Sequence, residues 1–486
     1  MRWVASLTIG RIETVFTLFV LLTGAGCSGY HKPEVPRIED FIHVAMTQAG
    51  GKRPQMPATE GDISLSFTPS KKQPLTLGGC VGIALDKNPL NRAAKEGVAA
   101  AEEAAGEARA PYYPTLGLTS GYSRWQQHAF LPSGVVPPSG NDEIGPTNDW
   151  SVGLEARFTL FDSGERRAKL RAAIAEQGVA KEDAAKIRQD IALDVHQSFY
   201  SLVAAGENLS VAEKNLARTE DHLRLTKTRH EAGAVPIADV YRAQVEVADS
   251  RLELVRAKNL VRIAGGDLNT AMGLPVELSV DIDARAEKIQ SPENIALDQA
   301  FDQAVHMRPE LKSALQKIAV RGHRVDEARS AFGPTVQALG GYGWRDDDFL
   351  PEDKDWLVGL SVELPLFTGF SRKHKLSKTM AEMRQAEAET SRLIQQVRQE
   401  VWAAHSKLTE SFEAVQAVGV LVKDAQESMR STRKRYEVGA GTITDLLDAQ
   451  TALARAEAAA VAARWDYHIA EAQLNRSTGT LLDDKP

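Results

Sequence analysis

The second half of this chain repeats the first half in a fixed register, and no other feature of the sequence constrains the fold as strongly. Residues 149–154 (DWSVGL) return as residues 355–360 (DWLVGL), an offset of 206 (355 less 149). The same offset relates Gly233 to Gly439, so the copies align without a gap over about 120 residues. Both copies are therefore expected to build the same long elements, and function is expected where the copies differ.

The two copies differ in the length of one loop. Pro89 returns as Pro309, an offset of 220 (309 less 89), which exceeds the downstream offset by 14 (220 less 206). The additional residues fall within residues 125–149, a stretch rich in proline and glycine that indicates an exposed loop. The matching stretch of the second copy, residues 345–355, is shorter and rich in aspartate.

The composition argues against several classes of function. Aromatic residues make up 6% of the chain, and Ala, Glu, Lys, Arg and Gln dominate, which is typical of long helices rather than of a globular enzyme. The formal net charge of −7 gives no reason to expect nucleic acid as a partner. The histidines and two cysteines show no metal-ligand spacing, and Cys80 aligns with Ala300 as a buried packing residue. We therefore predict no enzyme activity, no cofactor and no metal site.

The N-terminus has the pattern of an export signal. Residues 1–26 carry two arginines, then an apolar run, then small residues. The sequence Gly-Ala-Gly-Cys at residues 24–27 resembles a bacterial lipobox, with glycine where leucine is usual, so Cys27 is expected to become the lipidated first residue. Cleavage after Ala25, which would leave this cysteine unmodified, is the alternative. Residues 27–74 are rich in proline and are expected to form an extended tether.

Four segments of about ten residues alternate apolar side chains with small, polar or charged ones. These predicted strands are residues 115–124, 151–161, 335–344 and 357–367. Segments of this length with one apolar face are typical of transmembrane β-strands, although half-buried strands of a soluble sheet would alternate similarly. Together with the export signal, the pattern predicts membrane-spanning strands whose two connecting loops lie on the same, outer side.

A long proline-free segment follows the second strand of each copy. Residues 163–231 and 369–437 would each form a helix of about 100 Å at 1.5 Å per residue. Apolar residues recur at every seventh position in both segments, which predicts supercoiled packing against another helix. This seam consists of Val195, Leu202, Leu209, Leu216 and Leu223 in the first copy and of Val401, Leu408, Val415, Val422 and Met429 in the second. Glycines at the ends of the segments permit tight turns into return helices.

Four strands are too few to close a membrane barrel within one chain. The smallest single-chain barrels have eight strands, and an open strand edge in lipid leaves backbone groups unpaired at a cost of several kcal/mol each. Two chains would supply eight strands around a filled interior, whereas three would supply twelve strands around a lumen. The polar faces of the strands favour the wider barrel, so we predict a homotrimer embedded in outer-membrane lipid.

The mature sequence resembles the TolC family of outer-membrane efflux proteins over essentially its whole length. The motifs that carry the resemblance are Cys27 with its tether, Asn88-Pro89, Arg308-Pro309, the strand ends at residues 160–161 and 365–367, RYEVG at residues 435–439 and TITDLLDAQ at residues 442–450. The resemblance implies a mixed α and transmembrane β fold, in which a trimeric 12-stranded outer-membrane β-barrel continues into a 12-helix periplasmic α-barrel. It also implies a lipid-anchored, passive exit duct for drugs, metals or other small molecules. Its partners would be a periplasmic membrane-fusion adaptor and an inner-membrane pump of the resistance-nodulation-division type.

The layout expected from the repeat and the resemblance has six parts. They are a signal peptide (1–26), a lipid-anchored tether (27–74), a first efflux repeat (75–273, with its return helix at 237–272), an inter-repeat equatorial linker (274–296), a second efflux repeat (297–479, with its return helix at 443–478) and a C-terminal tail (480–486).

The family's periplasmic gate lies at the two helix-turn-helix tips, and the resemblance transfers this role to matching residues. Asp445 and Asp448 share a helix face and would form a carboxylate ring that attracts cations and raises its own pKa values. Solvated acids at a helix start are the alternative. Tyr436 would bond to Asp239 to hold the gate shut, and Gly441 stands where the family often has a basic residue. The tip turns and adaptor docking surface would comprise Gly233, Gly439, Gly441, Ala243, Gln244, Ala449 and Gln450.

Two other functions fit parts of the pattern. The outer-membrane component of type I protein secretion would use the same duct. A periplasmic coiled-coil adaptor or scaffold without a pore would share the long helices, but it would carry one helical hairpin rather than two and would lack lipid-facing strands. The exported substrate is not specified by these motifs, because a wide duct selects weakly.

Overall fold

The computed structural model describes residues 74–124, 148–283, 289–291, 296–346 and 348–482. The chain divides into two units, Met1–Thr68 and Pro69–Pro486, and every described residue belongs to the second unit. Several predictions fall outside the described residues. They are the signal peptide, lipidation at Cys27, the tether up to residue 73, residues 125–147 of the first loop, parts of the linker 274–296 and the end of the tail.

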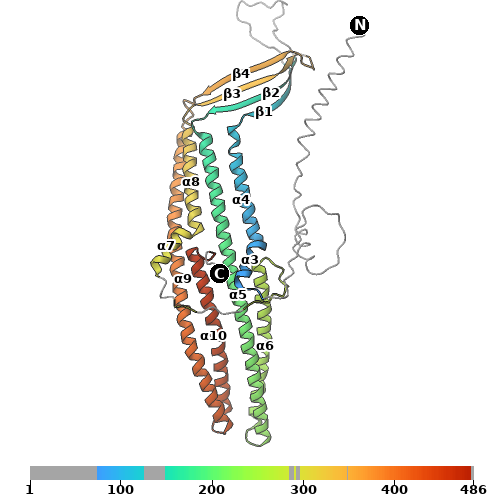
Figure 1. Cartoon of the computed structure of the whole chain (residues 1–486), viewed down its shortest axis with the longest axis vertical. Helices are drawn as coiled ribbons and strands as arrows, with labels where there is room; N and C mark the ends of the chain where they lie inside the picture. Colours follow the sequence, from blue (N-terminus) through green and yellow to red (C-terminus); the bar gives the residue numbers. More distant parts are fainter. Residues whose placement is uncertain (1–73, 125–147, 284–288, 292–295, 347, 483–486) are drawn as a thin grey trace, which may run out of the picture. The chain divides into compact units, whose positions relative to one another are not determined.

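The same series of elements occurs twice along the chain (Figure 1). The first copy comprises α3 (Leu77–Lys87), α4 (Pro89–Glu107), the 3-10 turn η1 (Ala110–Tyr112), β1 (Thr115–Arg124), β2 (Asn148–Phe161), α5 (Glu165–Glu231) and α6 (Ile237–Ala271). The second copy comprises α7 (Leu297–Met307), α8 (Pro309–Ser330), β3 (Thr335–Asp346), β4 (Lys354–Glu363), α9 (Ser371–Glu437) and α10 (Ile443–Thr478). None of the helices in the described ranges combines the length and the apolar character needed to cross a membrane.

The strands differ from the prediction at their ends. The strand predicted at residues 357–367 forms at Lys354–Glu363, because Pro365 has no N–H to donate to a strand ladder. β2 begins at Asn148 rather than at residue 151, because Asn148 still pairs with Arg124 across the ladder. The second strand of the second copy is therefore followed by a segment outside the ladder.

The long helices begin two residues later than predicted, at Glu165 and Ser371 instead of residues 163 and 369. The backbone before each helix lies in the left-handed region, with φ of 53° at Ser163, 96° at Gly164 and 63° at Phe370. A helix cannot include residues in that conformation. The chain therefore turns sharply between the strand and the helix in both copies.

In each copy an arginine stabilises the turn between the second strand and the long helix. Arg166 donates a hydrogen bond from Nη1 to the Pro111 carbonyl (3.1 Å), and its guanidinium lies over the Tyr112 ring at 5.0 Å. In the second copy Arg372 donates from Nη1 to the Ala331 carbonyl (3.2 Å) and lies over the Phe332 ring at 5.2 Å. Each arginine thus ties the start of a long helix to the end of the short helix before its strands.

The long helices provide the core that the two copies share. α5 and α9 are 67 residues each, about 100 Å at 1.5 Å per residue. α5 packs along α6, α9 packs along α10, and α5 also contacts α8 and α10. The predicted seam is fully buried at Val195 and Val401, whereas Leu216 and Val422, nearer the hairpin tips, are half-buried. Cys80 is fully buried beside this core, as predicted, and burial raises the pKa of its thiol to about 11.

A glycine at the end of each return helix supports the junction between the short helices. At Gly273, where φ is 72°, an added Cβ would lie 2.7 Å from the Asn88 backbone. At Gly479, where φ is 85°, an added Cβ would lie 2.9 Å from the backbone nitrogen of Arg308. Only glycine permits both the left-handed backbone and this approach. The junctions of the two copies are thus built alike, but one presents an asparagine and the other an arginine.

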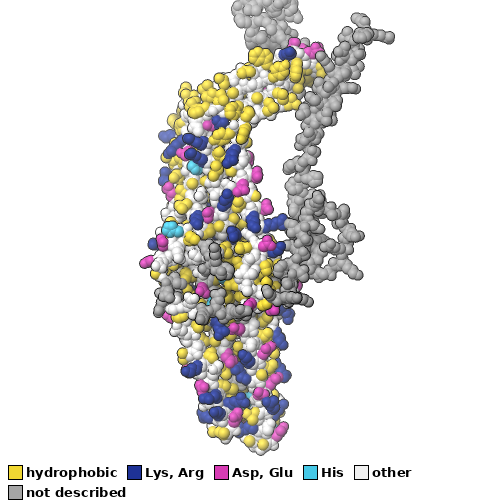
Figure 2. All heavy atoms as spheres, viewed as in Figure 1, with side chains coloured by type: hydrophobic (Ala, Val, Ile, Leu, Met, Phe, Trp, Pro, Cys, Tyr) yellow, Lys and Arg dark blue, Asp and Glu magenta, His cyan; other side chains and the backbone are white. Residues whose placement is uncertain are grey.

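The four strands form one antiparallel sheet in the order β1-β2-β3-β4. Tyr122 pairs with Trp150 and Tyr342 pairs with Trp356, which places aromatic side chains at one end of the sheet. Figure 2 shows hydrophobic side chains across the surface of the sheet, and Leu360 in β4 is 72% exposed. Within the described chain β1 and β4 are sheet edges, so two ladders of backbone groups remain open for other strands.

Candidate functional site

The two hairpin tips of the chain lie against each other and enclose a cleft. The α5–α6 turn contributes Arg229 and Asp239, and the α9–α10 turn contributes Tyr436 and Gly441. Gly233 (φ 75°) and Gly439 (φ 82°) make the sharp turns, as the glycine positions predicted. The cleft is therefore built by both copies, and the copies differ in this region at Pro236 against Thr442 and at Arg242 against Asp448.

Tyr436 is the buried anchor of this cleft, with 2% of its surface exposed. Its hydroxyl lies 3.4 Å from the Thr226 hydroxyl, and the His222 ring meets its ring edge-on at 5.4 Å between centroids. Arg229 donates a hydrogen bond to the Tyr436 carbonyl, and its guanidinium lies 4.8 Å from the ring centroid. Arg229 of the α5–α6 hairpin therefore supplies a basic group to the α9–α10 tip, where Gly441 has no side chain to do so.

Asp239 takes a different partner from the one expected. Its carboxylate lies 3.4 Å from the Arg242 guanidinium on the same helix, while Tyr436 bonds to Thr226. Tyr436 and Asp239 line the same cleft, yet each is engaged elsewhere within the chain. A bond between them, as implied by the family resemblance, stays a prediction for the assembled protein.

Asp445 and Asp448 are both exposed near the start of α10. Asp445 accepts a hydrogen bond from the Thr442 N–H (3.1 Å), and the Thr442 hydroxyl accepts one from the Asp445 N–H (3.1 Å). This reciprocal cap satisfies two N–H groups at the helix start. The hydrogen bonds with Thr442 lower the pKa of Asp445, which is opposite to the predicted rise. The predicted rise concerns a ring of carboxylates from several chains and stays a prediction.

Three residues assigned to the docking surface are buried in the chain itself. Ala243 and Gln450 are each 1% exposed, and Ala449 is 8% exposed, so they cannot meet a partner directly. They lie on helix faces that pack against the neighbouring long helices, which the turn motif alone does not reveal. Gln244, at the first-copy position of Gln450, is exposed, so of the two glutamines only Gln244 is accessible, and its contact with an adaptor stays a prediction.

Sequence reasoning missed the polar stripe that supports Tyr436. Thr219, His222 and Thr226 are buried along α5, at spacings of three and four residues that place them on one helix face. Burial lowers the pKa of His222 to about 4, so this histidine is neutral at physiological pH. The predicted leucine seam runs beside this stripe, and apolar periodicity could not identify polar residues that pack inward.

Replacing Arg229 with methionine is expected to loosen the contact between the two tips. The change removes the hydrogen bond to the Tyr436 carbonyl and the stacking on its ring, together about 2 kcal/mol. Backbone amides of residues 436–442 should then exchange with deuterium about 30-fold faster. Arg224→Met is the control, because Arg224 is exposed and forms its ion pair with Asp221 on its own helix. Equal exchange in both variants would refute the anchor role of Arg229.

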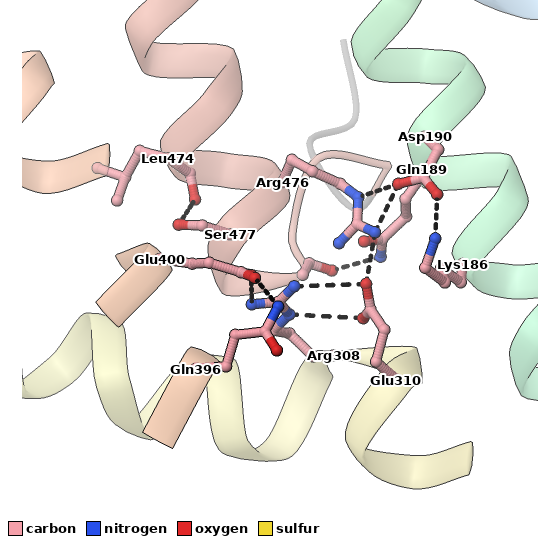
Figure 3. A network of polar contacts seen from close by, with 11 residues as sticks. Lys186, Gln189, Asp190, Arg308, Glu310, Gln396, Glu400, Leu474, Arg476 and Ser477 are labelled. Carbon is pink, nitrogen blue, oxygen red and sulfur yellow. Dashed lines mark hydrogen bonds and ion pairs between the residues drawn. The ribbon is translucent and has the colours of Figure 1, made fainter. Parts of the chain in front are cut away.

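A second polar centre lies far from the tips, where α5, α8, α9 and α10 meet (Figure 3). Arg476 donates from Nε (2.8 Å) and Nη2 (2.6 Å) to Asp190, and from Nη2 to Glu310 (2.5 Å). Arg308 donates from Nη1 to Glu400 (2.6 Å) and from Nη2 to Glu310 (3.4 Å). We call these five residues the equatorial ion network.

The equatorial ion network is largely withdrawn from water. The side chains of Arg308, Arg476 and Glu310 are 7%, 9% and 13% exposed. Burial alone would raise the pKa of Glu310, but the hydrogen bonds and charges of the two arginines outweigh it and hold the pKa at about 2. The network therefore joins both copies through ionised groups at the glycine-supported junction of the second copy.

The first copy has an uncharged side chain at this position of its junction. Asn88, which aligns with Arg308, donates from its side-chain nitrogen to the Ala271 carbonyl (2.9 Å) and caps α4 by accepting from the Leu90 N–H (2.9 Å). The sequence shows this difference between the copies as a change of one residue. Its consequence was not foreseen, because Arg308 meets Glu400 across 92 positions and the other members of the network, Asp190 and Arg476, lie on two further helices.

Both copies of the repeat are similar in sequence to known proteins. A family model described as outer membrane efflux protein matches residues 80–274 and 300–480. Protein CyaE of Bordetella pertussis is 27% identical over 391 residues, which cover 78% of each chain. Outer membrane protein TolC of Vibrio cholerae is 23% identical over 396 residues, covering 79% of this chain and 86% of the relative. The toluene efflux pump outer membrane protein TtgC of Pseudomonas putida is 24% identical over 380 residues, covering 76% of each.

Solved structures show the same fold. A membrane protein from Pseudomonas aeruginosa superposes with a TM-score of 0.73 at 24% identity, covering 83% of this chain and 90% of that protein. The outer membrane protein VceC from Vibrio cholerae superposes with a TM-score of 0.72 at 18% identity, covering 83% of this chain and 96% of that protein. The family model covers both copies of the repeat and well over half of the residues. The chain therefore belongs to the outer membrane efflux protein family.

Proposed function

We propose that the chain is the outer-membrane exit duct of a tripartite efflux system and that it conducts small molecules passively. The observation that carries the proposal is a four-stranded sheet with two open edges, joined directly to two long helical hairpins. Membership of the outer membrane efflux protein family supports it. One relative is named for the export of pyoverdine and another for the efflux of toluene. Because these are different small molecules, we propose only a broad substrate class for this chain.

The working form is a homotrimer. Three chains contribute twelve strands, which close the open edges of β1 and β4 and leave a lumen lined by the polar strand faces. The helical hairpins of the three chains then form a twelve-helix tunnel beneath the barrel. The exposed apolar residues of β4, such as Val358 and Leu360, face lipid in this arrangement.

The hairpin tips form the gate and the contact with the adaptor. Asp445 and Asp448 of each chain face the axis, and Arg229 with Tyr436 holds the two tips of one chain together. A periplasmic membrane-fusion adaptor contacts the exposed turns at Gly233 and Gly439 and links the duct to an inner-membrane pump of the resistance-nodulation-division type. Lipidation at Cys27, supported by the lipobox-like sequence before it, anchors the N-terminus in the outer membrane.

Placing an arginine on the apolar face of β4 tests the membrane assignment. Leu360→Arg is expected to cost about 2–4 kcal/mol per chain at the bilayer midplane and to prevent stable insertion. Ser361→Arg is the matched control, because it makes the same change at the next residue, on the opposite face of the strand. The measurement is the fraction of each protein that stays in the membrane pellet after a carbonate wash.

Wild type and Ser361→Arg should remain in the pellet and conduct current in planar bilayers, whereas Leu360→Arg should do neither. Release of the wild type by carbonate, without detergent, would mean that the protein is not an integral barrel. That result would instead support a peripheral adaptor or scaffold. Equal insertion of both arginine variants would overturn the assignment of the lipid-facing side.

A further inference from the structure

An exposed apolar segment connects β4 to the start of α9. Leu366 and Phe367 are 87% and 75% exposed, and Phe370 is 62% exposed. Phe370 has φ of 63°, a left-handed conformation that is unfavourable for a bulky residue, and the first copy has Gly164 at this position (370 less 206). The second copy thus keeps a strained aromatic residue where it is exposed, which suggests that the ring has a partner outside the chain.

Basic residues follow this segment at once. Residues 371–378 (SRKHKLSK) contain four Lys or Arg residues and no Asp or Glu. Arg372 is used in the strand-to-helix joint, but Lys373 and Lys375 are exposed. Figure 2 shows Lys and Arg side chains gathered on the helices directly beneath the apolar surface of the sheet. The net charge of −7 conceals this local concentration of positive charge.

The first copy adds cations at the corresponding level. Arg166 and Lys169 are paired with Asp162 and Glu165, whereas Arg167 and Arg171 are exposed. Among the described residues no carboxylate lies within 4.0 Å of the charged groups of Arg167, Arg171, Lys373 or Lys375. We call these four residues the basic collar.

The four cations of the basic collar do not stabilise the helices on which they lie. Cations in the first turns of a helix oppose the helix dipole, and the first turn of α9 holds no acidic residue that would offset them. Anions supplied from outside the chain would reverse this unfavourable interaction. Lys373 and Lys375 of the collar directly follow the apolar segment in the sequence, which points to a partner that is apolar on one side and anionic on the other.

The spacing matches the boundary of a lipid leaflet. Lys373 and Lys375 lie about 3 and 6 Å along α9 from Ser371, at 1.5 Å per residue. The headgroup layer on each side of a bilayer is about 5–8 Å thick, and lysine side chains extend along apolar surfaces to reach it. Phe367 and Phe370 would then lie at the edge of the hydrocarbon, with the cations at the phosphate level.

We propose that the basic collar binds the phosphate groups of anionic phospholipids in the membrane leaflet that faces the helices. This inference rests on the proposed function, because it requires the sheet to span the outer membrane. The partner is a lipid headgroup that carries net negative charge, such as that of phosphatidylglycerol. Binding of this kind fixes the depth of the barrel and the level at which the helices leave the membrane.

The test measures which lipid surrounds the inserted protein. The full-length chain is reconstituted in phosphatidylcholine vesicles with a trace of spin-labelled phosphatidylglycerol or spin-labelled phosphatidylcholine, and electron paramagnetic resonance gives the motionally restricted fraction of each tracer. The wild type should restrict the anionic tracer about fivefold more strongly, a total preference of about 1 kcal/mol, as expected where each headgroup meets one cation near the surface. This preference should fall at high salt.

Lys373→Gln/Lys375→Gln should lose most of this preference, and adding Arg167→Gln/Arg171→Gln should abolish it. The control is Lys214→Gln/Lys423→Gln, which removes two exposed lysines from the same long helices but far from the sheet. A wild type that inserts and conducts but restricts both tracers equally would overturn the collar alone. A wild type that fails to insert in any vesicle would overturn the proposed function as well, so the two failures are distinguishable.

Discussion

Replacing Arg476 with methionine is expected to destabilise the folded chain by about 3–5 kcal/mol, the largest single effect that we foresee on stability. The methionine fills similar volume but leaves the carboxylates of Glu310 and Asp190 without their main cation. Glu310 is only 13% exposed, so solvent cannot replace the lost interaction. Urea unfolding in detergent, followed by circular dichroism, measures the change in the free energy of unfolding.

The control for this change is Arg464→Met. Arg464 lies on the same helix and pairs with Glu207 on the same partner helix at 3.3 Å, but both side chains are at least one-third exposed. Exposed ion pairs contribute about 0–1 kcal/mol, so Arg464→Met should change stability little. Similar losses in the two variants would show that the burial of the equatorial ion network confers no special stability.

The pH dependence of unfolding gives an independent measurement on the same network. The pKa of Glu310 is about 2 in the folded chain, against an ordinary value of 4.5. The ionised carboxylate therefore stabilises the fold above pH 4.5, and this contribution is lost as the pH falls toward 2. Arg476→Met should shrink the loss over this pH window, because the hydrogen bonds and charge that lower the pKa are removed. An unchanged acid dependence would contradict the assignment.

Local patterns predicted the elements of the fold well. The strand alternation, the seven-residue seam and the turn glycines each involve residues close together in sequence, and the repeat allowed every pattern to be checked twice. The errors at strand and helix ends have local causes as well. Pro365 ends the ladder early, and the left-handed backbone at Ser163 and Phe370 delays the long helices.

The candidate site was less predictable, because its contacts join distant parts of the chain. Arg476 meets Asp190 across 286 positions and Glu310 across 166 positions, and no periodicity relates these residues. Gln244 and Gln450 occupy equivalent positions in the two copies, yet one is exposed and the other is buried. The repeat identifies such pairs of equivalent residues, but the packing of one copy against the other determines which member of a pair is buried.

The unequal tips determine how the charge of the proposed gate should be tested. Arg242 stands in the first copy where the second has Asp448, and it pairs with Asp239, so that pair adds no net charge to the tips. In the first turns of α6 and α10 the net negative charge therefore comes from Asp445 and Asp448. Three chains would bring six such carboxylates around the axis. An asparagine at residue 445 can still accept the Thr442 N–H, so Asp445→Asn removes charge while keeping the cap.

Asp445→Asn/Asp448→Asn is therefore expected to change ion selection without unfolding the helix tip. In planar bilayers the permeability ratio of potassium over chloride should fall by roughly an order of magnitude, because the ring that concentrates cations is neutralised. Loss of like-charge repulsion should also change the fraction of time for which the channel is closed. Asp267→Asn/Asp424→Asn removes the same charge from exposed positions away from the tips and should leave selectivity unchanged. If the tip variant and this control select ions alike, the two aspartates are solvated acids at a helix start and the constriction lies elsewhere.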